Sequence, residues 1–265
     1  MKYIDIEKSV RESNSKLLRG LPSFAVSLII WIVRQNEMNR ILNKHSEVIG
    51  VPFLKAMIEE FNLKIEVDGL ENLPDDSRCV FVSNHPFGVV DGLVLTSIIA
   101  NKYGDFKALG NDAFMLIPNL RPLIAEINVF GRNSKQQVVA LDEFYSSNVP
   151  ITHFPAGEVS RIYHGKIQDC EWQKSFITKA VQKKRTVVPI FFEGRNSRFF
   201  YFLFIFRRMF GVKLNFELML LPREMFKKKN KTIRVKIGKP IPYQTFDSSK
   251  TQYEWAQWVK QEVYK

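Results

Sequence analysis

From residue 63 onward the sequence alternates short β-type runs with longer helical stretches, and this alternation constrains the fold more than any other feature. Seven runs rich in β-branched and aromatic residues are expected to be strands, at 63–67, 78–83, 106–110, 123–130, 149–154, 186–192 and 232–238. Four stretches are expected to be helices, at 91–102, 134–147, 170–184 and 249–265. Such alternation indicates an α/β fold with a mixed, largely parallel sheet flanked by helices.

Residues 1–62 lack this alternation, and we expect a helical N-terminal extension there, followed by one α/β domain over 63–265. Within the extension, residues 24–33 are apolar except for Ser27. This run is too short to span a bilayer, which takes about 20 apolar residues. It is expected to be either a core helix or a helix in contact with a membrane. The charged start, MKYIDIEKSVRES, predicts no cleaved export signal.

Positive charge is concentrated in one part of the chain. The net charge is +12, and residues 199–239 contain eleven Lys or Arg against two Glu. Eight of the 22 phenylalanines lie between residues 199 and 226. A mixture of apolar and basic residues suits an anionic membrane surface. Nucleic acid is not the expected partner, because no reading motif accompanies the charge. The two cysteines support neither a disulfide framework nor a Cys-based zinc site.

The stretch SNHPFGVVDG, residues 83–92, places His85 and Asp91 six positions apart where a strand is expected to give way to a helix. Pro86 disfavours helical geometry at His85, and Gly88 permits a positive φ, so the chain can fold back and bring the two side chains together. A neutral imidazole held by a carboxylate can take a proton from a substrate hydroxyl. The alternative interpretation is that His85 only ends a strand and Asp91 only caps a helix.

Four segments, in order, resemble the four motif blocks of the glycerolipid acyltransferases. They are NHPFGVVD (84–91), INVFGRNS (127–134), FPAGEVSR (154–161) and VVPIFFEGRNS (187–197), within a resemblance that covers roughly residues 65–240. The chain is more specifically similar to the hemolysin-like branch of Bacteroidetes, related to the O-acyltransferases that complete ornithine and glycine lipids. This resemblance implies a glycerol-phosphate acyltransferase-like fold and a reaction that needs no metal or organic cofactor.

The resemblance also implies roles for individual residues. His85 and Asp91 match the catalytic dyad, and Arg132 matches the arginine that binds the anionic head group of the acceptor. The remaining expected site residues are acceptor-binding Gly157, Glu158 and Arg161, and supporting Asn84, Gly88, Pro189 and Arg195.

The chain departs from the family pattern in two places. Five residues, instead of the common four, separate His85 from Asp91, which moves the expected acceptor toward an aminolipid. Ala156 stands where the family usually has a glutamate, and Glu158 either replaces that carboxylate or pairs with Arg161. His153 and His164 also lie near the third block, but their spacing matches no metal-ligand pattern.

We therefore expect an O-acyltransferase that moves a fatty acyl group from an acyl carrier protein or acyl-CoA thioester to a lysolipid hydroxyl. The acceptor is expected to be a lyso-aminolipid or lysophosphatidate. The expected location is the cytoplasmic face of the inner membrane, as a peripheral or monotopic protein. The alternatives are a non-catalytic peripheral protein that binds membrane lipid and, with less support, a basic nucleic-acid-binding protein.

Overall fold

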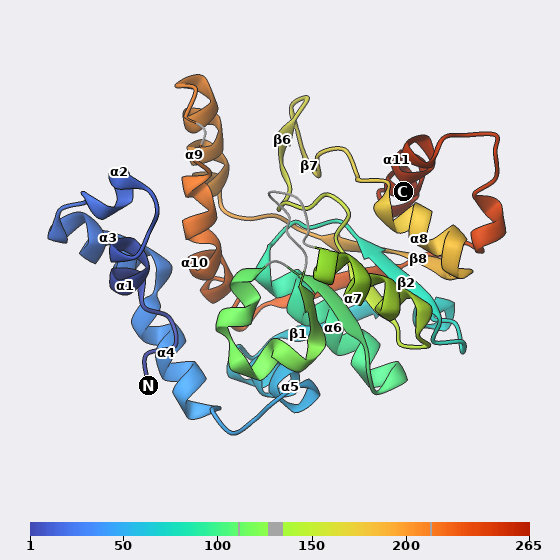
Figure 1. Cartoon of the computed structure of the whole chain (residues 1–265), viewed down its shortest axis with the longest axis horizontal. Helices are drawn as coiled ribbons and strands as arrows, with labels where there is room; N and C mark the ends of the chain where they lie inside the picture. Colours follow the sequence, from blue (N-terminus) through green and yellow to red (C-terminus); the bar gives the residue numbers. More distant parts are fainter. Residues whose placement is uncertain (111, 127–134, 213) are drawn as a thin grey trace.

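A seven-stranded sheet forms the centre of the molecule, shown in Figure 1 as a computed structural model that describes all residues except 111, 127–134 and 213. The strand order is β1-β9-β8-β2-β5-β3-β4. The strands are β1 (Lys64–Asp68), β2 (Cys79–Ser83), β3 (Lys107–Gly110), β4 (Ile124–Glu126), β5 (Ile151–His153), β8 (Thr186–Glu193) and β9 (Thr232–Ile237). All neighbours pair in parallel except β8 and β9, which are antiparallel. The expectation of a mixed, largely parallel sheet is confirmed.

Helices cover both faces of the sheet, because successive strand residues point to opposite sides. Phe81 of β2 joins a core cluster with helices α4 (Gln35–Lys44), α5 (Val51–Glu60) and α6 (Val89–Tyr103). Its neighbours Val80 and Val82 join a second cluster with α7 (Lys135–Ser146), α8 (Ser175–Lys183) and α11 (Gln252–Val263). The two hydrophobic clusters thus make a three-layered α/β architecture.

The N-terminal residues are helical, as expected. Helices α1 (Ile6–Arg11), α2 (Lys16–Arg19) and α3 (Ser23–Val33) precede α4. Helix α3 exposes Phe24, Leu28 and Trp31 and buries Val33. No helix in the described part of the chain is long and apolar enough to cross a membrane. Because α5 packs Phe53 into the main core cluster, the boundary between residues 62 and 63 stays a prediction.

Two helices and a hairpin were not expected from the sequence. Helix α9 (Arg198–Met209) stands beside the sheet and is followed by α10 (Leu221–Phe226) (Figure 1). A small hairpin, β6 (Arg161–Tyr163) and β7 (Lys166–Gln168), turns at His164 and Gly165, whose φ angles are 51° and 75°. Short 3-10 turns complete the structure, namely η1 (Leu70–Asn72), η2 (Asp112–Leu116), η3 (Pro118–Leu123), η4 (Phe216–Leu220) and η5 (Tyr243–Thr245).

Two predicted elements differ in extent from the observed ones. The helix expected over 170–184 begins only at Ser175. Before it, the Trp172 backbone N–H donates to Gln257 Oε1 and the Gln173 backbone N–H donates to the Pro155 carbonyl, so this stretch is bound to neighbouring elements instead of coiling. The strand expected over 123–130 is observed at 124–126, and residues 127–130 lie outside the described part.

Candidate active site

His85 lies in the turn between β2 and α6, at the carboxyl end of the central strand of the sheet. Ligand sites in open parallel sheets form at this edge. Asp91 occupies the third position of α6, where its carboxylate also accepts hydrogen bonds from backbone N–H groups of the turn that have no partner within the helix. The sequence expectation that a turn brings the two side chains together is met by this arrangement.

The His85 imidazole and the Asp91 carboxylate are adjacent. His85 Nδ1 lies 3.1 Å from Asp91 Oδ2, and the Asp91 side chain is fully buried. The same Oδ2 accepts hydrogen bonds from the backbone N–H groups of Phe87 (2.9 Å) and Gly88 (3.2 Å), and Oδ1 accepts one from Gly92 (3.0 Å). Nδ1 is not aligned for a hydrogen bond, and such bonds in unliganded sites commonly tighten when substrate binds.

A second buried carboxylate holds the backbone of His85. Asp169 Oδ1 accepts hydrogen bonds from the His85 backbone N–H (3.2 Å) and the Ser160 hydroxyl (2.6 Å). Asp169 Oδ2 accepts one from Trp172 Nε1 (2.9 Å). The Ser160 backbone N–H donates to the His85 carbonyl (2.8 Å), and the Phe154 ring stacks on the imidazole with centroids 4.1 Å apart. The backbone and ring plane of His85 are therefore fixed by the third block and the loop after it.

Asp169 was missed from the sequence, since it lies in a loop with no motif around it. Burial raises the pKa of its carboxyl group, against the lowering effect of the Ser160 and Trp172 hydrogen bonds. Helix α11 supports the loop, because Tyr264 Oη accepts from the Asp169 backbone N–H and Lys260 Nζ donates to the Asp169 carbonyl. Only the three-dimensional fold, with partners up to 95 residues away in the chain, reveals this network.

Three of the expected supporting residues shape the turn around the dyad. The Asn84 side chain makes two hydrogen bonds to the backbone of Phe192 in β8, which ties the turn to the neighbouring strand. Gly88 has φ 93°, and a Cβ there would lie 2.9 Å from Leu221 Cδ2. Pro189 lies in β8, opposite Val82 of β2. Asn84 and Gly88 thus fix the turn that carries His85 and Asp91, and Pro189 lies in the neighbouring strand.

The three site residues expected from the third block, Gly157, Glu158 and Arg161, lie in different surroundings. Gly157 has φ 69°, in the region that glycine adopts at no steric cost. Glu158 accepts a hydrogen bond from the Tyr163 hydroxyl, and burial together with this carboxylate raises the pKa of Tyr163. The pairing of Glu158 with Arg161, which was one of two alternatives, is absent from the described contacts, because Arg161 pairs elsewhere.

Arg161 is 1% exposed and lies in a buried ionic network. Its Nε lies 3.3 Å from Glu217 Oε1, and its Nη1 donates to the carbonyl of Val159. Arg207 Nε lies 2.9 Å from the other oxygen of Glu217. The Arg161 guanidinium also lies over the ring of Phe200, 4.8 Å from its centroid. Through these contacts Arg161 joins the hairpin to α9 and η4.

Arg132 and Arg195 are the two arginines of the repeated GRNS sequence. Arg132, the expected ligand of the acceptor head group, lies outside the described residues. Arg195 is exposed, and its carbonyl accepts a hydrogen bond from Lys228 Nζ (2.9 Å). Lys228 Nζ in turn lies 4.2 Å from the centroid of the Phe87 ring, which places two cations near the turn that carries the dyad.

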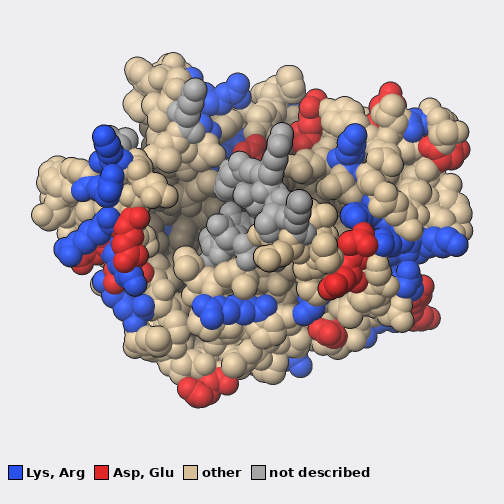
Figure 2. All heavy atoms as spheres, in the orientation of Figure 1, with Lys and Arg blue, Asp and Glu red and all other residues tan. Residues whose placement is uncertain are grey.

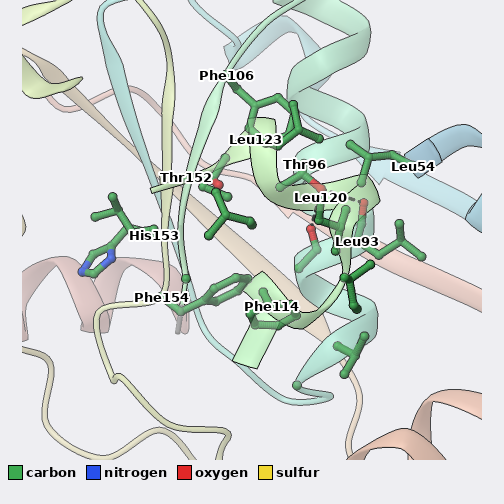
Figure 3. Close-up of a pocket in the computed structure, with 18 of the residues that line it drawn as sticks. Leu54, Leu93, Thr96, Phe106, Phe114, Leu120, Leu123, Thr152, His153 and Phe154 are labelled. Carbon is green, nitrogen blue, oxygen red and sulfur yellow. Dashed lines mark hydrogen bonds between the residues drawn. The ribbon is translucent and has the colours of Figure 1, made fainter. Parts of the chain in front are cut away.

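An apolar cavity of about 360 Å³ opens beside His85 (Figure 3). Most of its wall comes from α5, α6 and η3 and the strands beneath them, and includes Leu54, Leu93, Phe106, Leu120, Leu123 and Phe154. A cavity with such a wall can hold an alkyl chain, since burying each methylene gains about 0.8 kcal/mol. Among the described residues, no group of three His, Cys, Asp or Glu side chains is placed to hold a metal ion.

A His-Asp pair with a fully buried carboxylate borders an apolar cavity on the carboxyl edge of a largely parallel sheet, and such an arrangement can support base-assisted chemistry on a molecule with an alkyl chain. Comparison with known proteins gives the class. The chain belongs to the acyltransferase family, whose model matches residues 8–265, and it is an acyltransferase. The family membership expected from the four motif blocks is thus confirmed.

Two curated relatives are similar over nearly the whole chain. A protein of Phocaeicola vulgatus is 44% identical over 263 residues, which cover 99% of this chain and 94% of the relative. A protein of Bacteroides thetaiotaomicron is 44% identical over 263 residues, covering 99% and 97% of the two chains. Both are named lyso-glycine lipid O-acyltransferase. The solved structure of the 1-acyl-sn-glycerophosphate acyltransferase PlsC of Thermotoga maritima is 17% identical, with a TM-score of 0.49 over 91% of this chain and 92% of that one.

Proposed function

We propose that this acyltransferase moves a fatty acyl group from a thioester donor to the hydroxyl of a lysolipid, with His85 as the general base. The observation that carries the proposal is the position of the His85 imidazole, which borders the apolar cavity while Asp91 lies against its Nδ1. The side chain is 17% exposed, so its other nitrogen is accessible to a substrate hydroxyl.

In the proposed step, His85 Nε2 takes the proton of the acceptor hydroxyl as the oxygen attacks the thioester carbonyl. A C–O bond forms, the C–S bond breaks, and the thiolate leaves with the proton that His85 held. The buried carboxylate of Asp91 stabilises the imidazolium between these events, since opposite charges interact strongly where water is excluded. Base catalysis of this kind contributes typically 10²–10⁴-fold to the rate.

We propose a lyso-aminolipid as acceptor, with lysophosphatidate as the second candidate. The names of the two curated relatives, which are similar over the full chain, support the first. The buried pairing of Arg161 with Glu217 leaves Arg132 as the proposed ligand for the anionic head group, and exposed Arg195 lies beside the same turn. A planar guanidinium suits a carboxylate or a phosphate equally well. Gly157 and Glu158 stay proposed acceptor contacts.

An exposed apolar surface indicates how a lipid substrate reaches the site. Along one face of α9, the rings of Phe199, Phe202, Phe206 and Phe210 follow one another, with centroids 4.6 to 6.4 Å apart. All four are more than 40% exposed. Figure 2 shows uncharged atoms over the upper end of α9 with Lys and Arg side chains beside it. Helix α3 exposes further apolar side chains and packs against α10 and η4.

We propose that these faces of α3 and α9, here called the aromatic face, lie in the interfacial region of an anionic membrane. Bulky apolar side chains that are exposed to water are stabilised when they transfer to the interfacial region, and the flanking cations are attracted to anionic lipid. The protein would then be peripheral or monotopic, with the cytoplasmic face of the inner membrane as its proposed location.

The activity is tested with purified protein, an acyl thioester, and vesicles that contain lysolipids of both acceptor classes. His85→Asn is expected to lower acyl transfer at least 10²-fold while the melting temperature stays near that of the wild type. The matched control is His164→Asn at the hairpin turn, where asparagine tolerates the positive φ. Full turnover by His85→Asn would refute the role of His85. Vesicle binding by a wild-type protein without turnover would favour the non-catalytic lipid-binding alternative.

The membrane surface is tested by sedimentation with anionic vesicles. The double change Phe202→Ser with Phe206→Ser is expected to lower binding at least tenfold, because each exposed ring gives up its contact with lipid. Val138 and Val139 on α7 are also half exposed and provide the control pair for the same change to serine. Equal binding by both double variants would contradict the proposed aromatic face. Salt-sensitive binding of DNA without vesicle binding would favour the nucleic-acid alternative.

A further inference from the structure

The cavity beside His85 continues around the ends of β3 and β5 to the opposite face of the sheet. In addition to its apolar wall, it is lined by residues that belong to the α7 and α8 layer, namely Leu141, Tyr145, His153, Gln173, Ser175 and Lys179. Figure 3 shows the same division along β5, where His153 points away from the side taken by Thr152 and Phe154. We call this second part of the cavity the polar arm.

His153 is the buried polar group of this arm. Its side chain is 7% exposed, and neither ring nitrogen has a hydrogen-bond partner among the residues that the structure describes. The nearest described ring is that of Phe176, whose centroid lies 6.2 Å away. Leaving a buried donor or acceptor unpaired costs about 1–3 kcal/mol, so a histidine kept in this state indicates a partner that arrives with a ligand.

Burial lowers the pKa of His153 to about 4, so the ring is neutral at physiological pH. A neutral imidazole offers one N–H donor and one acceptor nitrogen. This pair of groups matches an amide, which also has one of each. It does not match an anionic group, which would need donors alone.

At its mouth the polar arm is open and lined by hydrogen-bonding and basic groups. Gln173 and Ser175 are exposed, and their side chains have no hydrogen bond to another described residue. The first turn of α8 has no side-chain cap, so the N-cap residue leaves its N–H groups available to an acceptor. Lys174, just before this turn, is exposed and lacks an ion pair within the described part of the chain. A phosphate is well accommodated by such a helix start with an adjacent cation.

We propose that the polar arm binds the amide-bearing pantetheine chain of the thioester donor, the part that acyl carrier protein and CoA share, and that His153 hydrogen-bonds the amide farther from the sulfur. The proposal depends on the proposed acyl transfer. A linear donor has an alkyl tail, a thioester, two amides and a phosphate in that order. The cavity is lined by groups that suit each of these parts, namely an apolar wall, His85, His153 and Ser175 at the start of α8.

The order of groups along the donor also indicates that the donor, and not the acceptor, occupies the polar arm. With the acyl tail in the apolar part and the thioester carbonyl beside His85, the leaving thiol must continue in another direction. The polar arm supplies that direction within the same continuous cavity. The acceptor is then left to approach from the side of the aromatic face, where a lipid in a membrane can enter.

The test compares two palmitoyl thioesters that differ only in the chain beyond the sulfur. Palmitoyl-N-acetylcysteamine has one amide and palmitoyl-pantetheine has two. For wild-type protein, kcat/KM is expected to be higher with the pantetheine donor. His153→Leu is expected to reduce this advantage about 5–10-fold, the loss that corresponds to one hydrogen bond, with an unchanged KM for the acceptor. His153→Gln keeps one donor and one acceptor and is expected to restore part of the advantage.

Three outcomes overturn or separate the proposals. An equal advantage in His153→Leu and wild type refutes the polar arm as the pantetheine site. A raised KM for the lysolipid alone assigns the arm to the acceptor instead. If wild-type protein transfers no acyl group, the proposed function fails, and the arm is then tested by calorimetric binding of S-hexadecyl-pantetheine, a thioether that cannot react. Weaker binding of this probe to His153→Leu supports the arm, and equal binding refutes it.

Discussion

Acidification should destabilise this protein through one residue, His153. In an unfolded chain its imidazole has the ordinary pKa of 6.5, whereas in the folded protein burial lowers the pKa to about 4. As the pH falls below 6.5, the His153 imidazole therefore binds a proton in the unfolded chain, whereas in the folded protein it stays neutral until the pH nears 4. The stabilising contribution of the neutral ring is complete above pH 6.5 and is lost as the pH falls toward 4.

The size of this effect follows from the two pKa values. At pH 4.5, a shift from 6.5 to about 4 corresponds to a loss of about 2–3 kcal/mol in the free energy of unfolding. Acidic side chains also begin to titrate in this range, so wild-type protein is compared with His153→Gln, which has a similar volume but no titrating ring. Between pH 7 and pH 4.5, wild type is expected to lose about 2–3 kcal/mol more than the variant.

The measurement is urea unfolding at both pH values, followed by far-ultraviolet circular dichroism. Thermal unfolding should agree, because 1 kcal/mol corresponds to roughly 2–4 °C in a chain of this size. Equal losses of stability in wild type and His153→Gln would refute the reasoning. His153 would then have a polar partner or water contact in the folded protein, and the unpaired state that supports the polar arm would not exist.

Three further changes probe the site. Asp169→Asn is expected to cost about 2–4 kcal/mol of stability in urea unfolding, because an amide cannot accept hydrogen bonds from all three donors that the Asp169 carboxylate binds. The same change is expected to lower kcat at least tenfold with little change in KM. An unchanged kcat would mean that Asp169 does not position His85. Gly88→Ala is expected to lose about 1–3 kcal/mol in the same assay, since φ is 93° and its Cβ would meet Leu221; wild-type stability would show that the turn relaxes freely. Glu217→Ala should cost about 3–5 kcal/mol by leaving Arg161 buried without its counter-charge, and a loss below 1 kcal/mol would contradict the buried pair.

Much of the fold could be predicted because the sheet is built from short apolar runs of β-branched residues. Each of the seven predicted strands is observed at least in part. The β6–β7 hairpin was missed although its turn, His164-Gly165, is of the kind that favours a tight hairpin. Helix α9 was missed because its phenylalanines occur on both faces, so no helical period stands out. Its inner face is buried against the hairpin and η4, whereas its outer rings stay exposed.

The dyad could be predicted because its constraints are local. Pro86, Gly88 and the start of α6 lie within a few residues of His85 and Asp91, and a turn of this kind leaves few ways to place the two side chains. The ionic contact of Arg161 could not be predicted in this way, because its carboxylate partner Glu217 is 56 residues away in the chain.

His153 was discounted at first for a related reason. In the sequence it is one histidine among four, and nothing near it suggests a ligand. The structure singles it out because its ring nitrogens lack hydrogen-bond partners among the described residues. This depends on what surrounds the side chain in space and not on its neighbours in the sequence. A pattern of residue types cannot show which buried nitrogen lacks a partner.

The dependence of the Asp169 loop on α11 has a consequence for how the enzyme becomes active during synthesis. β2 and His85 leave the ribosome early, while Lys260 and Tyr264, which hold the loop that binds the His85 backbone, are made 175 and 179 residues after His85. Until then, the histidine lacks its anchor. A nascent chain that already has the aromatic face and can meet a membrane would therefore be catalytically immature until α11 has docked.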